Sequence, residues 1–173
     1  MGEIIVHIAH MVGIAGAAFL SGFIACFSHA GVPTLNLAPV DILVKEFRTM
    51  YNIGKSTSPL FAVIVTMCNG FSAYHSKDST SLVLRSVSPF ALYLAATMCV
   101  PCIIPYTVLY MEPTVNVKLL DMGAKAEKGA KARDLGTSEK DIRDMLVRWK
   151  GMNFIRAAIV GTGALLTGIA TCL

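Results

Sequence analysis

Four long apolar segments constrain the fold of this chain more than any other feature. They lie at about 4–27, 57–75, 88–111 and 154–173. Roughly 20 helical residues are needed to cross the hydrocarbon core of a bilayer, which is about 30 Å thick. Peptide groups in lipid must hydrogen-bond within their own segment, so each run is predicted to be a helix. We therefore expect an all-α integral membrane protein, a four-helix bundle in which residues 1–173 form one domain.

The charged residues are few and unevenly distributed. Hydrophobic residues make up 54% of the chain and charged residues 15%, against about 25% charge in soluble domains. Ten of the 15 Lys and Arg residues lie between Lys118 and Arg156. The formal net charge of +4 therefore reflects one basic region and does not indicate a nucleic-acid partner. All five cysteines fall within apolar runs, which argues against a disulfide framework.

The distribution of Lys and Arg also predicts the orientation. Thirteen of them, counting Arg156, lie on the side of segments 28–56 and 112–153, whereas Lys77 and Arg85 lie on the other side. Positive charge accumulates on the cytosolic side of membrane proteins, so these two segments are predicted to be cytosolic loops. Both termini would then be non-cytosolic, in a multi-pass protein of the endoplasmic reticulum.

Both cytosolic loops are expected to contain amphipathic helices. In the third loop, Ser138 followed by Asp141 fits a capping box, and apolar residues recur after it at helical spacing. This pattern predicts a helix that lies at the membrane surface and leads into the fourth span. Segment 123–133 is expected to be a mobile or weakly helical linker. In the first loop, an interfacial helix is expected at 40–51. Its lipid-facing side chains would be Phe47, Met50 and Tyr51.

Several residues inside the spans are explained by helix packing. Pro101 and Pro105 should kink the third span, and a buried Asn69 should hydrogen-bond to a neighbouring helix. Cys99 and Cys102 form a CxxC, but thiols in mid-span stay protonated, so small hydrophobes are favoured over a redox pair. The residues expected to permit close packing of the fourth span are Gly161, Gly163 and Gly168.

Polar and aromatic residues gather at the predicted cytosolic ends of the spans. They are Ser28, His29, Tyr51, Asn116, Trp149, Asn153 and Arg156. A charge inside an apolar run is costly and usually faces the bundle interior, which favours a functional role for Arg156. A structural role is equally open, because Arg156 could reach to headgroups and Trp149 could anchor the interface.

Four motifs in this sequence together resemble the anthrone oxygenase family, small four-helix membrane proteins of aromatic polyketide pathways. They are AAFLSGFIACFSHAGVPTL, FRTMYNIGKSTSPLFA, PYTVLYMEPTVNVKLL and LVRWKGMNFIRAA. They occur in the family's order and touch all four spans. One departure is Val115, which stands where the family often has Asn, so that only Asn116 remains there.

The resemblance implies a membrane monooxygenase that converts an anthrone to an anthraquinone with dioxygen as co-substrate, without a flavin or nicotinamide cofactor; a metal is not excluded. No glycine-rich phosphate loop occurs in the sequence. We expect Asn116, Asn153 and Arg156 to bind the oxygen side of the hydrophobic aromatic substrate. His29 is the candidate base, because imidazole transfers protons near neutral pH. The expected substrate-binding residues are Ser28, Tyr51 and Trp149.

Other readings remain open. A metal held by His7, His10 and His75 is one alternative, although histidines near a helix end are more often interfacial polar groups. The chain could instead be a non-enzymatic scaffold or carrier whose basic loop recruits a partner or anionic lipid. A membrane isomerase or cyclase would use the same polar cluster for proton transfer. The sequence is also compatible with a homo-oligomer.

Overall fold

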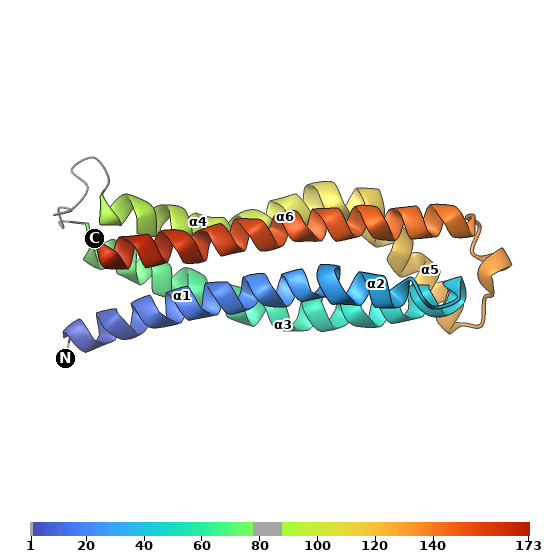
Figure 1. The fold of residues 1–173 in the computed structure, drawn as a ribbon, viewed down its shortest axis with the longest axis horizontal. Coiled ribbons are helices and arrows are strands. Elements are labelled where there is room, and N and C mark those ends of the chain that lie inside the picture. The colour runs from blue at the N-terminus through green and yellow to red at the C-terminus, as the bar shows by residue number, and fades with distance from the viewer. Residues whose placement is uncertain (1, 78–87) are drawn as a thin grey trace. The chain divides into compact units, whose positions relative to one another are not determined.

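The structure is a computed structural model that describes residues 2–77 and 88–173 (Figure 1). These residues form helices and turns, with no strand among them, so the predicted all-α class is confirmed. In chain order the elements are α1 (Gly2–Cys26), η1 (Phe27–Gly31), α2 (Val32–Leu35), α3 (Val40–His75), α4 (Pro89–Tyr106), η2 (Thr107–Asn116), α5 (Val117–Glu127), η3 (Ala132–Asp134) and α6 (Glu139–Cys172). Arg85, which entered the orientation argument, lies outside the described residues.

Three continuous helical stretches among the described residues are long and apolar enough to cross a membrane. They are Glu3–Leu35, Pro89–Glu127 and Glu139–Cys172. α3 is not among them. The chain therefore has the apolar helices of a membrane protein.

The chain forms two compact units. Unit 1 comprises Met1–Gly22, Ser58–Ile104 and Arg156–Leu173, and unit 2 comprises Phe23–Thr57 and Pro105–Ile155. Unit 2 holds 21 of the chain's 26 charged residues. The division falls beside Pro59 in α3 and at Pro105 in α4, where a helix loses a backbone donor.

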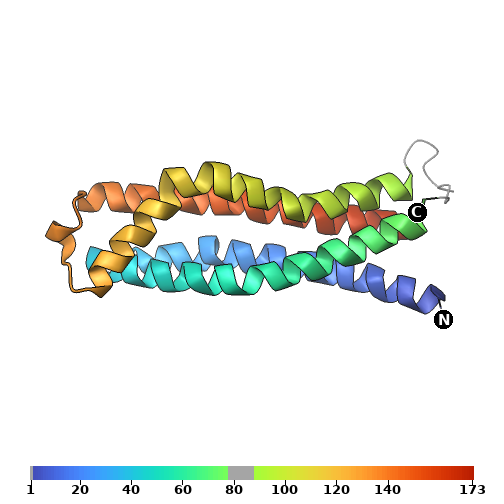
Figure 2. The same cartoon turned by 180° about the vertical axis from the view of Figure 1, so that it is seen from behind.

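Small residues bring the helices of unit 1 close together, where parts of α1, α3, α4 and α6 run alongside one another (Figure 2). A Cβ atom added at Gly161 would lie 2.9 Å from Ser21 Oγ, and one at Gly163 would lie 3.1 Å from Cys99 Cβ. The predicted packing role of these two glycines is confirmed. It is wrong for Gly168, because no described atom lies within 4 Å of the corresponding position.

Unit 2 has an apolar core of its own. The side chains of Phe47, Met111 and Leu146 are completely buried in it, and burying a side chain of this size contributes about 1.5–3 kcal/mol. The expectation that Phe47 faces lipid is therefore wrong, and Met50 and Tyr51 are half-buried against the same core. The interfacial helix expected at 40–51 is the beginning of α3, which continues unbroken to His75.

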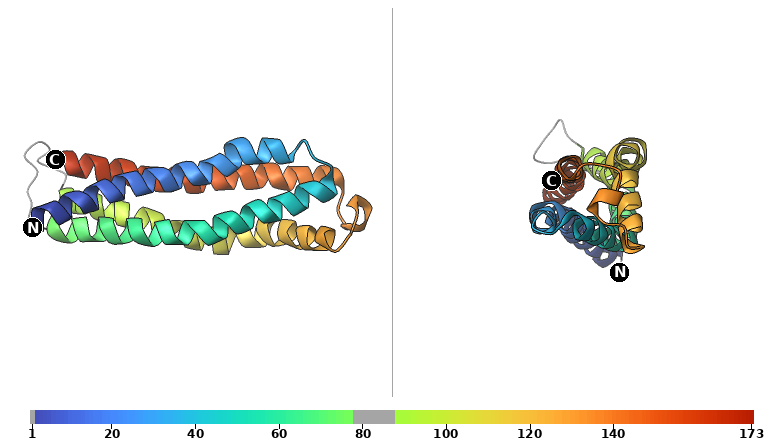
Figure 3. Two further views of the ribbon diagram at one scale, coloured as in Figure 1. Left: turned by 90° about the horizontal axis from the view of Figure 1, so that it is seen from below. Right: turned by 90° about the vertical axis from the view of Figure 1, so that its right-hand side faces the viewer.

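The prediction of a mobile or weakly helical linker at 123–133 is wrong for its first part. Gly123 lies in α5, which packs beside α3 within unit 2 (Figure 3, left). A Cβ added at Gly123 would lie only 2.6 Å from the carbonyl oxygen of Val44. An ion pair between Arg48 and Glu127 joins the same two helices. The absence of a side chain at Gly123 is therefore what allows α5 to dock.

The predicted cap at Ser138 is confirmed, because the amide of Asp141 donates to Ser138 Oγ at 3.2 Å. The amphipathic segment after it is the first half of α6, which continues to Cys172. Its apolar face, with Ile142 and Leu146, is buried in the core of unit 2. That face packs against protein because helices of the same unit cover it.

Gly123→Ala should destabilise the protein although alanine favours helix more than glycine does. Overpacking of this kind costs about 1–3 kcal/mol. Gly151→Ala in α6 is the matched control, because no described atom lies within 4 Å of its added Cβ. It should stabilise the helix by about 0.5–1 kcal/mol. Thermal unfolding in detergent should show midpoints that move in opposite directions. A rise in both midpoints would contradict the close docking of α5.

Candidate functional site

Three of the predicted site residues lie inside unit 2 as buried polar side chains. Ser28, Asn116 and Asn153 are 0%, 1% and 2% exposed. They come from η1, η2 and α6, segments that are distant in the sequence. Buried polar groups need hydrogen-bond partners, because an unpaired group in apolar surroundings is costly. The partners of each side chain therefore show whether it serves structure or is available to a ligand.

Asn153 and Ser28 are hydrogen-bonded within unit 2. Asn153 Nδ2 donates to the carbonyl oxygen of Ile24 at 2.8 Å and to Ser28 Oγ at 3.0 Å. Ser28 Oγ in turn donates to the carbonyl oxygen of Lys150 at 3.1 Å. These bonds fasten the end of α1 and the start of η1 to α6. Both side chains thus position the segment that carries His29.

Three of the candidate residues lie on two π-helical segments. η1 carries Ser28 and His29, and Asn116 is the last residue of η2. π-helical turns are rare and occur frequently at functional sites. Pro113 in η2 has no amide hydrogen, so the regular α-helical bond at this turn is lost in any case. Reasoning from the sequence missed both segments, and Pro113 is the signal that could have indicated the second one.

Asn116 and Trp149 present hydrogen-bonding groups that no described residue satisfies. Asn116 Nδ2 and Oδ1 and Trp149 Nε1 are buried without a partner among residues 2–77 and 88–173. Each such group costs about 1–3 kcal/mol if it stays unpaired. The Trp149 ring packs edge-on against Phe47, with ring centroids 5.2 Å apart. An amide and an indole N–H in an apolar interior are suited to bind the oxygen of a hydrophobic ligand.

The other predicted site residues are placed differently. His29 is exposed, although it follows buried Ser28. Tyr51 is half-buried, with its ring centroid 6.2 Å from that of Phe47. Arg156 is half-buried and is the first residue of the last segment of unit 1. The structure thus gathers Ser28, Asn116, Trp149, Asn153 and Tyr51 within unit 2, with His29 on its surface.

The histidines and cysteines of unit 1 do not form a cluster of metal ligands in the described part of the chain. No group of three or more His, Cys, Asp or Glu side chains there could hold a metal ion. The rings of His7 and His10 are 6.3 Å apart, and His75 packs against Phe71. Cys99 and Cys102 are free thiols.

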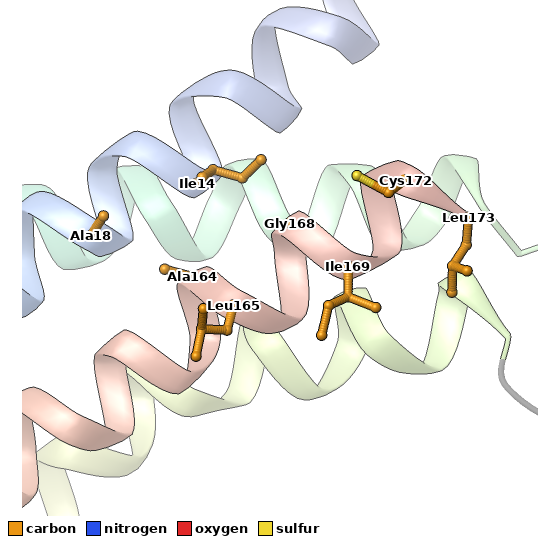
Figure 4. A pocket seen from close by; sticks show the side chains of 8 residues that line it. All are labelled: Ile14, Ala18, Ala164, Leu165, Gly168, Ile169, Cys172 and Leu173. Carbon is orange, nitrogen blue, oxygen red and sulfur yellow. The ribbon is translucent and has the colours of Figure 1, made fainter.

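Unit 1 also has an apolar groove of about 540 Å³ between α1 and α6 (Figure 4). Its lining includes Ile14 and Ala18 of α1 and Ala164, Leu165, Gly168 and Ile169 of α6. Ligand pockets commonly have volumes of about 300–1,000 Å³, but they combine apolar walls with a few polar groups. These aliphatic side chains offer no hydrogen-bonding group that would orient a ligand. The groove is therefore a weaker candidate for a binding site than the buried polar residues of unit 2.

Comparison with known proteins identifies the relatives of the chain. A family model described as anthrone oxygenase matches residues 47–166. An anthrone oxygenase of Aspergillus fumigatus (encC) is 30% identical over 169 residues, which cover 90% of this chain and 88% of that protein. An anthrone oxygenase of Claviceps purpurea is 30% identical, with 94% of this chain and 88% of that protein covered. The anthrone oxygenase AgnL2 of Paecilomyces divaricatus is 27% identical, with 91% and 92% covered. No solved structure matches the chain significantly.

Asn153→Ala should loosen η1, because it leaves the Ile24 carbonyl and Ser28 Oγ without their donor. Loss of a buried partner costs about 1–3 kcal/mol. Hydrogen exchange followed by mass spectrometry should show faster exchange in peptides that cover residues 24–32. Asn52→Ala, at an exposed position of α3, is the matched control and should leave those peptides unchanged. Equal exchange in the two variants would contradict the fastening role of Asn153.

Proposed function

Because the chain belongs to the anthrone oxygenase family, we propose that it oxidises an anthrone-type polycyclic aromatic polyketide to the anthraquinone with dioxygen, in a membrane. The observation that carries this proposal, beside the family, is the pair of donors on Asn116 and Trp149 that have no partner among residues 2–77 and 88–173. They lie in an apolar interior, which suits a flat hydrophobic molecule with an oxygen at its edge. The relatives named above are each called anthrone oxygenase.

The proposed reaction replaces the two hydrogens of the anthrone methylene by one oxygen. The methylene carbon loses four electrons and dioxygen accepts them, so that one oxygen atom becomes the new carbonyl and the other leaves as water. Loss of a methylene proton gives a carbanion that is delocalised onto the ring oxygen. This anion donates an electron to dioxygen. The protein then needs to supply a base, donors to the ring oxygen and an enclosure that excludes water.

We assign these tasks to the residues of unit 2. Asn116 Nδ2 and Trp149 Nε1 would donate to the substrate oxygen that gains charge. Asn153 and Ser28 would hold η1 in place through their mutual hydrogen bond. His29, which is exposed, would accept the methylene proton at the surface of unit 2. Tyr51 would contribute aromatic surface to the flat ligand.

We further propose that unit 1 lies in the bilayer as four spans. The segment 58–75 of α3 carries no charged residue and belongs to the same compact unit as the apolar parts of α1, α4 and α6. Unit 2, with 21 of the 26 charged residues, would face the cytosol, since positive charge accumulates there. Both termini would then be non-cytosolic, in the endoplasmic reticulum membrane.

Oxygen labelling tests the reaction itself. Purified protein in lipid nanodiscs, given emodin anthrone under ¹⁸O₂, should form anthraquinone with one labelled carbonyl and release the second labelled atom as water. Mass spectrometry of the product and of the solvent measures both. Label from H₂¹⁸O in the new carbonyl, under conditions that exclude exchange, would contradict direct transfer from dioxygen. Turnover that consumes no oxygen would favour an isomerase instead.

Asn116→Leu tests the donor pair. Leucine keeps the approximate volume of the side chain but removes the amide, and the loss of one donor to a developing oxyanion lowers turnover roughly 10²-fold. Oxygen uptake with the anthrone should therefore fall by that order, while thermal stability should stay equal or rise, since a buried unpaired group is removed. Asn52→Leu, exposed on the surface of α3, is the matched control. Normal uptake by Asn116→Leu would remove Asn116 from the site.

A further inference from the structure

Unit 1 also holds buried polar groups that no described residue satisfies. Asn69 of α3 is completely buried. Its Oδ1 accepts a hydrogen bond from Thr167 Oγ1 at 3.1 Å, which confirms the expected bond between helices. Its Nδ2 has no partner among the described residues. The Asn69 carboxamide therefore uses only its acceptor oxygen in the contact between helices. Its two N–H donors remain available to a ligand.

His10 of α1 is in the same situation. Both ring nitrogens are buried, and neither has a partner in the part of the chain that the structure describes. The imidazole stacks on the ring of Tyr93, with centroids 5.1 Å apart and planes at 19°. The Tyr93 hydroxyl is already bonded to Thr171 Oγ1 at 2.9 Å. The stack thus holds the imidazole ring in place against Tyr93, whereas its two nitrogen atoms have no described hydrogen-bond partner.

Gly13 relates these two polar groups to one face of α1. A Cβ atom added at Gly13 would collide with Asn69 Oδ1, so the Asn69 amide lies directly against α1 at this residue. His10 precedes Gly13 by three residues on α1, and residues at that spacing share a helix face about 5–6 Å apart. His10 and the Asn69 amide are therefore both placed against the same face of α1.

The surroundings indicate an uncharged ligand. The charged residues of unit 1 that the structure describes are Glu3, Lys77 and Arg156, and none of them has a described bond to His10 or Asn69. An imidazolium is costly inside an apolar span, which favours a neutral His10 with one donor and one acceptor nitrogen. Together with Asn69 Nδ2, these groups match a carbonyl or hydroxyl oxygen.

We propose that His10 and Asn69 form a second binding site, within unit 1, for the carbonyl or hydroxyl of an uncharged aromatic molecule that enters from the lipid. The half-exposed imidazole of His10, which stacks on the buried ring of Tyr93, supplies the aromatic surface of this site. The choice of an aromatic ketone or phenol as the ligand class also rests on the proposed function. The site binds and orients its ligand and performs no chemistry.

Photolabelling with benzophenone tests this site. Benzophenone is an uncharged diaryl ketone that inserts into nearby C–H bonds under near-ultraviolet light. Full-length protein in nanodiscs should be labelled in peptides of α1 around residues 10–14 and of α3 around residues 66–73. Excess 9,10-anthraquinone should suppress this labelling. Peptide mapping by mass spectrometry gives the yield at each position.

Three variants make the test specific. His10→Phe keeps an aromatic ring to stack on Tyr93 but removes both nitrogens, and Asn69→Leu removes the amide at similar volume. Each should lower the yield at these positions about tenfold, the effect of about 1.4 kcal/mol of lost hydrogen bonding. Ser72→Ala is the matched control on α3, because the Ser72 hydroxyl bonds to the carbonyl of Cys68 in its own helix. It should leave the yield unchanged.

Labelling that is uniform over lipid-facing residues, or unaffected by His10→Phe and Asn69→Leu, would overturn the second site and leave water as the partner of these groups. The proposed oxygenase activity is scored separately, by oxygen uptake of the wild-type protein with the anthrone. Absent uptake with specific labelling would remove the proposed function and keep this site. Normal uptake with unspecific labelling would do the reverse.

Discussion

Every polar group in an apolar interior must find a hydrogen-bond partner, and this requirement governs the whole chain. It explains why all the apolar segments are helical, since a helix satisfies its own peptide groups. It also explains the polar side chains that bond between or within helices, such as Ser21 to the carbonyl of Ala157 at 2.8 Å and Thr97 to the carbonyl of Tyr93 at 2.7 Å. Against this background, a buried polar group without a protein partner carries information. Such groups occur in both units.

The distribution of charge adds a second constraint. Arg143 illustrates how unit 2 uses its charged residues: its guanidinium donates to the carbonyl oxygens of Asn36 and Ala38 at 2.7 and 3.2 Å and also pairs with Glu139. One side chain thereby holds the turn between α2 and α3 against α6. A guanidinium has five donors in a fixed geometry, so it can satisfy several acceptors at once. Charges in this unit thus fasten connections between helices, whereas the helices of unit 1 are joined by glycine contacts and by hydrogen bonds of uncharged side chains.

Much of the fold could be predicted from the sequence, because apolar runs and a helix cap depend on local chemistry. Ser138 is such a case. The continuity of α3 could not be predicted, because residues 52–58 are polar and read as a loop. In the structure Gly54 lies within this stretch, and a Cβ added there would lie 3.3 Å from the ring of Phe27. That tertiary contact, together with the core around Phe47, supports helix where local sequence does not favour it.

The candidate site was partly predictable for the same reason. Polar residues near the ends of apolar runs, such as Asn116 and Asn153, are expected to be buried and bonded, and the structure buries both. Which of them is already satisfied depends on distant backbone carbonyls, such as that of Ile24, and sequence spacing does not reveal these. The π-helical geometry of η1 and η2 is hidden for a similar reason, since its hydrogen bonds span only one residue more than those of an ordinary α-helix.

The difference between Asn153 and Asn116 has a consequence for how such a protein could evolve. Asn153 is bonded to a carbonyl and a hydroxyl, so replacing it affects folding before it affects chemistry. Asn116 makes no such bond to the described residues, so an apolar residue there would fold at least as well. An amide at that position lowers the stability of the fold unless a ligand hydrogen-bonds to it. A stability cost without a structural benefit is the physical signature expected of a binding group, and Asn69 Nδ2 in unit 1 meets the same description.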